Sequence, residues 1–420
     1  MTIIRRFFIL AWFLILLTTG CVPAPSNSNT TVSTQPSPSP SASPSPATTD
    51  TASIQVTLPL LDALLTDEQF VARAKQNLKL SDQQIDEIKH VSSADVARLR
   101  ESNAEDLDGN GTDARERAEE QLRSALGEQK ARDLAKLANE YWSKGDTAEA
   151  SNDNLQMLKG PNAVPSDTRV VVNIPAFRMD LFQDGSLVKS YKVGIGYPQF
   201  PLPQGLRKAQ QIIFNPTWTP PDSPWVAKMK NVTAGETVGA GDKDNPLGPI
   251  KIPIGLPSLI HGGKSPAKIG KFASHGCVGL TNAQVKDFAT LLAQASNTAD
   301  VPSKMASYLE NKEKTRTVKL NQIVPVELRY ETIVIEDGKL HIYRDVYEQN
   351  TNTEENLRAV LEANGLKLED LSEQQRTEIL NALKSPLKKE LVIDLGTVAQ
   401  KGYPAPVNLD NGSGKKSTKT

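Results

Sequence analysis

The stretch TRVVVNIPAFRMDLFQDGSLVKSYKVGIG, residues 168–196, decides the fold class of the central part of this chain. Short runs of Val, Ile, Phe and Leu alternate with polar residues, which is typical of β-strands with one buried face. Asp184 and Gly185 separate two such runs, and an Asp-Gly pair between strands is a strong signal for a β-hairpin. This region is therefore predicted to open with a β-hairpin.

More segments with the composition of strands follow this hairpin. Turn residues separate them, in AQQIIFNPTW, GPIKIPIG, SLIHGG, QIVPVELRYETIVIEDG and KLHIYRDVYE. One helix is expected among them, in NAQVKDFATLLAQA at residues 282–295. We expect a mainly β, sandwich-like domain over residues 168–347.

Helical patterns flank this domain. From Leu134 to Tyr141, apolar residues recur at the i, i+3, i+4, i+7 spacing of one helix face. Ser81 followed by Gln84 predicts a capping box, and LSEQQRTEILNAL begins in the same way. We expect an α+β multi-domain chain. Its predicted parts are a helical domain at 53–160, the mainly β domain at 168–347, and a helical segment with a polar tail at 352–420.

The first 21 residues have the features of an export signal. Arg5 and Arg6 precede an apolar run at 7–17, which is short for a membrane span and is followed by small residues. LLTTGC, residues 16–21, resembles the bacterial lipobox, in which the cysteine is diacylated. This resemblance implies a lipid anchor on Cys21 and an exported protein that faces the periplasm or the cell wall. A signal with an incidental cysteine is the alternative.

Residues 22–52 form a linker rich in Pro, Ser and Thr, with almost no charge. Such a segment cannot bury apolar surface and favours extended polyproline conformations. We expect it to act as a spacer between the membrane anchor and the first domain.

Composition narrows the class of function. The chain has 420 residues and a formal net charge of −1, and nucleic-acid-binding proteins normally carry a basic excess. If Cys21 is lipidated, Cys277 is the only thiol of the mature chain. Exported proteins usually pair their cysteines, so a lone exported thiol is a candidate reactive group. A buried, inert cysteine is the alternative.

Histidines lie close to this thiol in the sequence. Cys277 follows His275 by two residues, and His261 ends the apolar segment SLIHGG. A cysteine nucleophile needs a base, and His has a suitable pKa. Gly276 permits a close backbone approach, and helix-favouring residues soon follow, so the thiol is expected near a helix N-terminus. The two histidines and the cysteine also leave a zinc site open.

The segments IHGG and SHGCVGLT together resemble the signature of the L,D-transpeptidases with a YkuD-type catalytic domain. That signature is a His, a spacer of a dozen or more residues, and then Ser/Thr-His-Gly-Cys. The opening hairpin, the segment FPLPQGLRKAQQIIFNPTWTPP and the NPLG at residues 245–248 also resemble parts of that domain.

The resemblance implies a role for each residue of the signature. Cys277 is the implied nucleophile and His261 its general base, with the backbone carbonyl of Gly262 as the third member. His275 shapes the site. The backbone N–H groups of Gly276 and Cys277 form the implied oxyanion hole.

Three further residues are implied in substrate binding. Ser274 holds the cysteine turn, and Trp218 lies in the substrate-side loop. Many relatives carry Arg or Asn two residues after the cysteine, whereas this chain has Gly279. Arg178 and Arg207 could bind a substrate carboxylate in its place, and an ordinary surface charge is the alternative for each.

The implied reaction is acyl transfer on peptidoglycan. The thiolate attacks the bond after the L-centre of the diamino acid in a tetrapeptide stem, D-Ala leaves, and an amine of a second stem or of an envelope protein resolves the thioester. Water in place of the amine gives an L,D-carboxypeptidase. No metal or cofactor is implied. An idle peptidoglycan-binding tether is the alternative from another class.

The segment DLDGNGTD, residues 106–113, has the opening of a calcium loop. The twelfth position of such a loop carries a bidentate Glu, and Arg117 stands there in this chain. We expect no calcium site and interpret the segment as a turn before the next helix.

Overall fold

The computed structural model describes residues 56–101, 111–144, 156–221, 226, 229–255, 258–396 and 402–413. These residues all belong to one contact unit, residues 52–420. The predicted export signal, the predicted lipidation site Cys21 and the linker predicted at 22–52 all fall outside the described residues. The first part of the calcium-like segment, 106–110, also falls outside them.

Five helices form the N-terminal helical domain, and side chains cap several of them. The side chains of Thr57 and Asp67 accept hydrogen bonds from backbone N–H groups in the first turns of α1 and α2. Ser81 and Gln84 exchange two hydrogen bonds of 3.2 Å, which confirms the predicted capping box. The bounds are α1 (Leu58–Leu64), α2 (Glu68–Leu78), α3 (Asp82–Glu101), α4 (Gly111–Leu126) and α5 (Glu128–Lys144).

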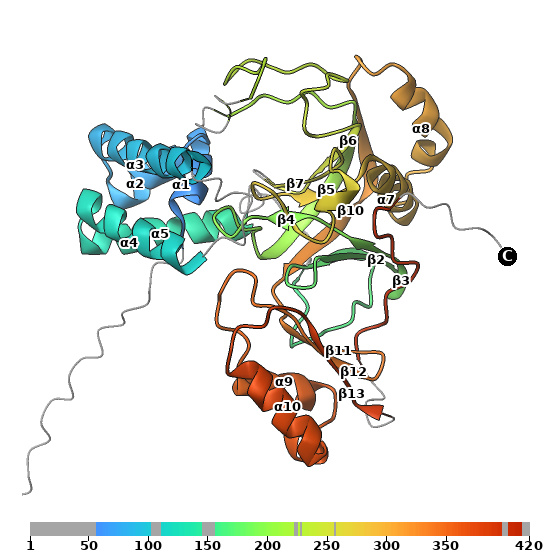
Figure 1. The fold of residues 1–420 in the computed structure, drawn as a ribbon. Helices are drawn as coiled ribbons and strands as arrows, with labels where there is room; N and C mark the ends of the chain where they lie inside the picture. The colour runs from blue at the N-terminus through green and yellow to red at the C-terminus, as the bar shows by residue number, and fades with distance from the viewer. Residues whose placement is uncertain are drawn as a thin grey trace, which may run out of the picture. The chain divides into compact units, whose positions relative to one another are not determined.

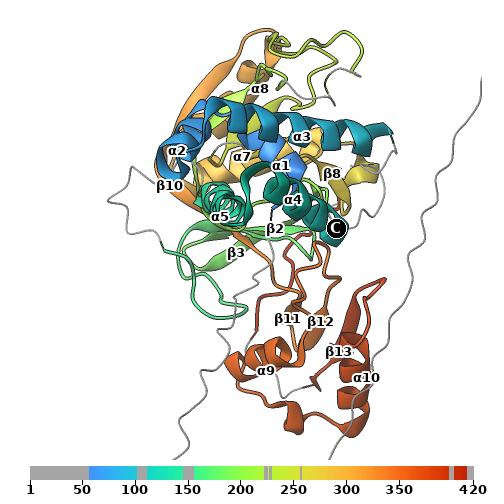
Figure 2. The same cartoon turned by 90° about the vertical axis from the view of Figure 1, so that its left-hand side faces the viewer.

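These helices share one apolar core, and both ribbon views show them gathered together (Figure 1, Figure 2). Leu134, Ala138 and Tyr141 are buried on the predicted face of α5. The Tyr141 ring meets Phe70 of α2 edge-on, with 5.3 Å between ring centroids. Short helices are marginal in isolation, so burial of this shared face is what stabilises them.

An eight-stranded mixed sheet forms the centre of the β domain (Figure 1). Its order is β3-β2-β1-β10-β5-β6-β7-β9; β1 with β10 and β7 with β9 are parallel, and the other pairs are antiparallel. Asp184 and Gly185 both have positive φ, 48° and 78°, as a two-residue type I′ turn requires. The predicted hairpin is confirmed. The bounds are β1 (Arg169–Asn173), β2 (Arg178–Gln183), β3 (Ser186–Lys192), β5 (Gly205–Phe214), β6 (Ile250–Pro253), β7 (Leu259–His261), β9 (Val278–Gly279) and β10 (Arg316–Arg329).

The predicted helix at 282–295 is confirmed as α7 (Asn282–Ala295). Thr281 and Gln284 form its capping box, and Phe288 and Leu292 bury its apolar face in the core of the sheet. A second helix, α8 (Asp300–Glu310), follows it. A two-stranded parallel pair, β4 (Ile195–Gly196) and β8 (Phe272–Ser274), completes the domain.

The C-terminal part is a small α/β unit with its own core. Strands β11 (Ile333–Glu336), β12 (Lys339–Ile342) and β13 (Leu391–Asp394) form a separate sheet. Helices α9 (Glu354–Ala363) and α10 (Glu373–Leu383) lie beside that sheet (Figure 1, Figure 2). The sequence predicts the segments of β11 and β12 as parts of the mainly β domain at 168–347, and the structure places them in a separate sheet. Strand alternation fixes which face is buried but not which sheet a strand joins, so this difference was invisible in the sequence.

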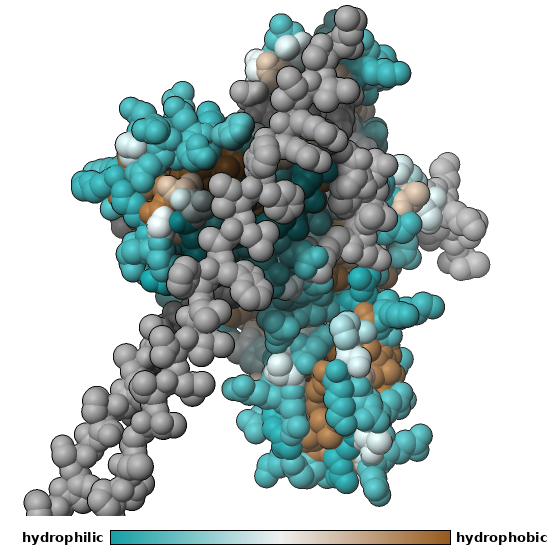
Figure 3. Space-filling view, turned by 60° about the vertical axis from the view of Figure 1, so that its left-hand side comes forward, coloured by the Kyte–Doolittle hydropathy of each residue, from teal (hydrophilic) through white to brown (hydrophobic). Residues whose placement is uncertain are grey.

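The overall class, α+β with a mainly β domain between helical parts, is confirmed. After α10 and β13, residues 402–413 return to the β domain and run along β3, where Lys192 N–H donates to the Asp410 carbonyl at 2.9 Å. None of the described helices has the length and apolar character needed to cross a membrane. On the face shown in Figure 3, hydrophilic side chains cover most of the described surface.

Candidate active site

Two neighbouring parallel strands bring the predicted histidine and cysteine together. In the register of β7 and β9, Ile260 pairs with Val278 and His261 pairs with Gly279. Cys277 directly precedes β9 and therefore lies level with Leu259 of β7. The Leu280 N–H continues the pairing by donating to the His261 carbonyl at 2.8 Å. Sheet pairing thus closes the gap of 16 residues between the histidine and the cysteine.

His261 is a buried, neutral imidazole. Only 4% of its surface is exposed, and its Nδ1 lies 2.7 Å from the Gly262 carbonyl oxygen. A carbonyl can only accept, so Nδ1 carries the proton, and the Leu247 backbone also hydrogen-bonds the imidazole. Burial, with the positive charge of Lys264, lowers the pKa of His261 to about 3. The structure therefore places the predicted base and the Gly262 carbonyl in direct contact.

The turn Ser274–Cys277 is held by hydroxyl groups. Ser274 Oγ accepts from the Cys277 N–H at 3.0 Å and donates to the Cys277 carbonyl. Ser258, fully buried at the start of the histidine strand, donates from Oγ to the Gly276 carbonyl at 3.0 Å. Ser274 therefore holds the turn as expected, and Ser258 is a second support that sequence analysis did not identify.

The predicted oxyanion hole is only partly available. The Cys277 N–H is engaged by Ser274 Oγ, whereas no described residue accepts a hydrogen bond from the Gly276 N–H. Gly276 has φ +93°, and a Cβ there would lie 2.9 Å from the Trp142 ring of α5. The glycine is required both by the backbone conformation and by this close approach.

Burial raises the pKa of the Cys277 thiol, while the Leu259 backbone and the Lys264 charge act in the opposite direction. The helix dipole that we expected to lower this pKa is not next to the thiol. Strand β9 stands between Cys277 and the start of α7 at Asn282. Burial therefore favours the thiol over the thiolate at Cys277.

His261 and Cys277 share one cavity of about 440 Å³. Within the described part of the chain, no hydrogen bond joins the imidazole to the thiol; in enzymes without substrate such bonds are often long and tighten on binding. Helix α1 contributes one wall of the cavity. The lining includes Pro59, Asp62, Ala63, Thr66, Tyr197, Phe200, Trp218, Leu259, His261, Lys264, Ser274, His275 and Cys277.

His275 lies against aromatic rings. Its ring meets Phe200 edge-on with centroids 4.5 Å apart, and Tyr197 at 5.7 Å. Among the residues that the structure describes, no cluster of three His, Cys, Asp or Glu side chains is placed to hold a metal ion. The zinc site that the sequence left open is thus not supported, and His275 shapes one wall of the cavity.

The two arginines considered as replacements for the missing side chain at position 279 have structural roles. Arg178 is buried in an ion-pair cluster with Asp180 and Glu336. Arg207 is fully buried and donates to the Gly255 carbonyl. Neither lines the cavity that contains Cys277. Lys264, which sequence analysis did not single out, does line it.

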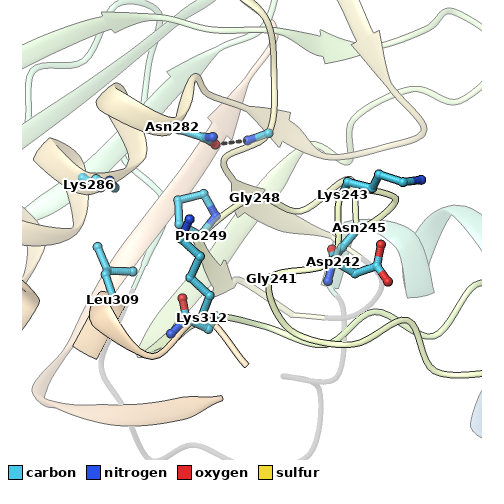
Figure 4. Close-up of a pocket in the computed structure, with 12 residues that line it drawn as sticks. Gly241, Asp242, Lys243, Asn245, Gly248, Pro249, Asn282, Lys286, Leu309 and Lys312 are labelled. Atoms are coloured by element: carbon cyan, nitrogen blue, oxygen red, sulfur yellow. Dashed lines mark hydrogen bonds between the residues drawn. The ribbon is translucent and has the colours of Figure 1, made fainter. Parts of the chain in front are cut away.

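A second cavity, of about 370 Å³, lies beside the histidine turn (Figure 4). Asn282, in the first turn of α7, accepts a hydrogen bond from the Gly263 N–H at 2.8 Å. A Cβ on Gly263 would lie 2.2 Å from the Pro246 carbonyl oxygen, and one on Gly248 would lie 2.4 Å from the Gly263 nitrogen. The NPLG segment therefore packs directly on the histidine turn.

Some residues of the site carry only weak signals in the sequence. Ser258 and Lys264 flank the histidine strand, and their polar side chains are common at strand ends. Trp142 and the α1 residues belong to another domain of the chain, so local sequence patterns cannot relate them to Cys277.

Comparison with known families supports the resemblance. The family model of the YkuD L,D-transpeptidase catalytic domain matches residues 167–318. This segment contains His261, Cys277 and all of their contacts on β7 and β9. Residues 167–318 are therefore similar to the L,D-transpeptidase catalytic domain. A comparison with curated proteins gave no match.

Solved structures of this family are only distantly similar. The catalytic domain of the E. faecium L,D-transpeptidase is 15% identical, with a TM-score of 0.26, over 40% of this chain and 100% of that one. The L,D-transpeptidase from Mycobacterium smegmatis is 15% identical, with a TM-score of 0.23, over 39% and 58%. The Ldtfm–avibactam carbamoyl enzyme is 17% identical, with a TM-score of 0.24, over 39% and 49%, so the match spans about half of that protein.

Proposed function

We propose that this protein, through its L,D-transpeptidase domain, is a cysteine acyltransferase that acts on peptidoglycan tetrapeptide stems. The observation that carries the proposal is the Cys277 thiol in one cavity with His261, a neutral base whose Nδ1 is fixed by the Gly262 carbonyl. The domain match over residues 167–318 supports the substrate class.

In the proposed acylation, the Cys277 sulfur attacks the carbonyl carbon that follows the L-centre of the diamino acid. His261 Nε2 takes the thiol proton as the C–S bond forms, and the Gly276 N–H binds the developing oxyanion. The C–N bond then breaks, His261 returns the proton to the amine, and D-Ala leaves. A thioester remains on Cys277.

In the proposed second half, an amine of another stem or of an envelope protein attacks the thioester. His261 takes a proton from this amine and returns it to sulfur as the C–S bond breaks. The low His261 pKa and the raised thiol pKa disfavour a resting thiolate–imidazolium pair. We therefore expect proton transfer to accompany C–S bond formation rather than precede it.

Intact-protein mass spectrometry tests this proposal. Incubation with a disaccharide-tetrapeptide should add the acyl mass on Cys277 and release D-Ala, and a carbapenem should acylate the same residue. Cys277→Ala should give no adduct while melting at the wild-type temperature. Release of D-Ala with hydrolysis, despite an added amine, would indicate an L,D-carboxypeptidase. Binding to sacculi without any adduct in wild type would indicate the idle tether and exclude the enzyme.

We further propose that the protein is exported and anchored to a membrane through a lipid on Cys21, with residues 22–52 as spacer. The support is the signal-like segment that ends in LLTTGC. Labelling with a radioactive fatty acid should mark the wild type and leave Cys21→Ser unlabelled, with Cys277→Ser as the matched control. Equal labelling of both variants would contradict the anchor.

A further inference from the structure

Lys264 is the feature of the site that the proposed mechanism does not use. Among the described residues that line the Cys277 cavity, it is the only Lys or Arg, and Asp62 is the only carboxylate. Lys264 follows the histidine turn, and its backbone N–H donates to the Leu280 carbonyl at 3.1 Å. This bond fixes the base of its side chain beside β9.

The stem of Lys264 occupies the space over Gly279. A Cβ on Gly279 would lie 2.8 Å from both Cγ and Cε of Lys264, and 3.3 Å from its Cδ. Gly279 is not among the residues with positive φ, so its backbone does not require glycine. Glycine is required at position 279 because the Lys264 side chain lies across it, so a larger residue at 279 would displace that lysine.

The ammonium group has no fixed counter-charge in the described structure. No described carboxylate forms an ion pair with Lys264, and the charged groups that act on it are Cys277 and Lys268. Asp62, the one carboxylate of the cavity, accepts a hydrogen bond from Ser93 Oγ at 2.5 Å. Burial lowers the pKa of Lys264, and partly buried cations are normally paired.

Burial raises the pKa of the Cys277 thiol, which makes the sulfur a weak counter-charge for Lys264. We propose that Lys264 binds the terminal carboxylate of the peptide substrate and so selects stems that end in a free acid. This inference deepens the proposed function and rests on it, and it makes Lys264 a specificity-determining residue. A lysine acts here as a point charge, without the bidentate geometry of an arginine.

Alkylation of Cys277 tests the charge without using the enzymatic reaction. Iodoacetate carries a carboxylate and iodoacetamide does not, so the ratio of their rates reports a cation at the thiol. Dividing this ratio by that of free glutathione removes the intrinsic reactivity of the reagents. Lys264→Met keeps the apolar stem of the lysine and removes its charge. We expect it to lower the normalised iodoacetate-to-iodoacetamide ratio about tenfold, which is the effect of one charge contact in a partly buried site. Lys264→Arg should retain most of it, and an unchanged ratio in Lys264→Met would overturn the proposal.

The same variants then separate substrate binding from an effect on sulfur. For a tetrapeptide acid, Lys264→Met should raise KM about tenfold with kcat little changed, while the peptide amide should serve both proteins equally. Gly279→Ala should resemble Lys264→Met, because its methyl group displaces the lysine stem. The contrary result is that Lys264→Met shifts the pH profile of iodoacetamide alkylation to higher pH and gives the same kinetics with the peptide acid and the peptide amide. In that case the lysine stabilises the thiolate, and the proposal is wrong. If no peptide acylates the wild type, the proposed function fails, and the alkylation ratio still decides whether an anion site exists.

Discussion

The two turns that hold His261 and Cys277, the proposed base and nucleophile, are built in different ways. The histidine turn, residues 261–264, is held by the sheet and its own domain: Gly263 packs against backbone of the NPLG segment, and Asn282 binds the Gly263 N–H. The cysteine turn, residues 274–277, is held mainly by side chains, among them the hydroxyls of Ser258 and Ser274. A tryptophan from the helical domain contacts it as well.

This difference assigns separate tasks to the two turns. Backbone packing buries His261 and keeps its imidazole neutral, so the properties of the base follow from the fold of the catalytic domain. The geometry of the nucleophile depends on side chains from several elements, and one of them, Trp142, lies outside the matched domain. Substitutions in the helical domain should therefore alter the geometry at Cys277 more readily than the properties of His261.

The largest effect is expected from removing the base. His261→Gln should slow acylation of Cys277 by about 10²–10⁴-fold, because it removes general-base help from the reaction. His275→Gln is the matched control and should retain most of the rate, since His275 shapes the cavity wall. Acylation rates from intact-protein mass spectrometry measure both. Equal losses in the two variants would remove the distinction between the two turns.

The second prediction compares one glycine from each turn. Gly263→Ala should destabilise the protein by at least about 3 kcal/mol, because its methyl group would meet the Pro246 carbonyl and its φ of +81° disfavours Ala. In Gly276→Ala, the added methyl group would instead contact the Trp142 side chain. Adding Trp142→Ala should relieve the steric part of that cost, leaving the strain of φ +93°.

Denaturant unfolding measures these costs. The comparison would be contradicted if Gly276→Ala lowered the free energy of unfolding equally with Trp142 and with Ala at position 142. This result would mean that the helical domain does not press on the cysteine turn.

The sequence was sufficient for the parts of the site that depend on short-range order. The Asp-Gly hairpin, the helix after the cysteine and the proximity of His261 to Cys277 all follow from local patterns or from the resemblance. The Lys264–Gly279 contact does not, because it joins a residue after β7 to strand β9, and the pairing of these strands is set by the whole sheet. The separate sheet of β11 and β12 does not follow from local patterns either. Arg178 was misjudged because an isolated arginine in a sequence carries no sign of the carboxylates that will surround it.

The smallest of the three effects concerns pH. The His261 pKa is lowered to about 3 in the folded protein from its ordinary 6.5, so from pH 7 to pH 5 only the unfolded chain binds a proton there. Stability from this residue is therefore lost as the pH falls, by about 2 kcal/mol over that interval. Denaturant unfolding at both pH values should show this loss in wild type and not in His261→Gln. A loss of the same size in the variant would place its origin in other groups.

The return of residues 402–413 to β3 has a consequence for the order in which the chain folds. Strand β3 is an outer strand of the eight-stranded sheet, and an uncovered outer strand invites pairing with other molecules. The segment that pairs with it, through Val407 and Asp410, follows the whole catalytic domain in the chain. During synthesis and any passage through a translocon, β3 therefore stays unpaired on its outer side until about two hundred further residues have been made. A chaperone that binds exposed strands would be most useful at β3, before residues 402–413 are available to pair with it.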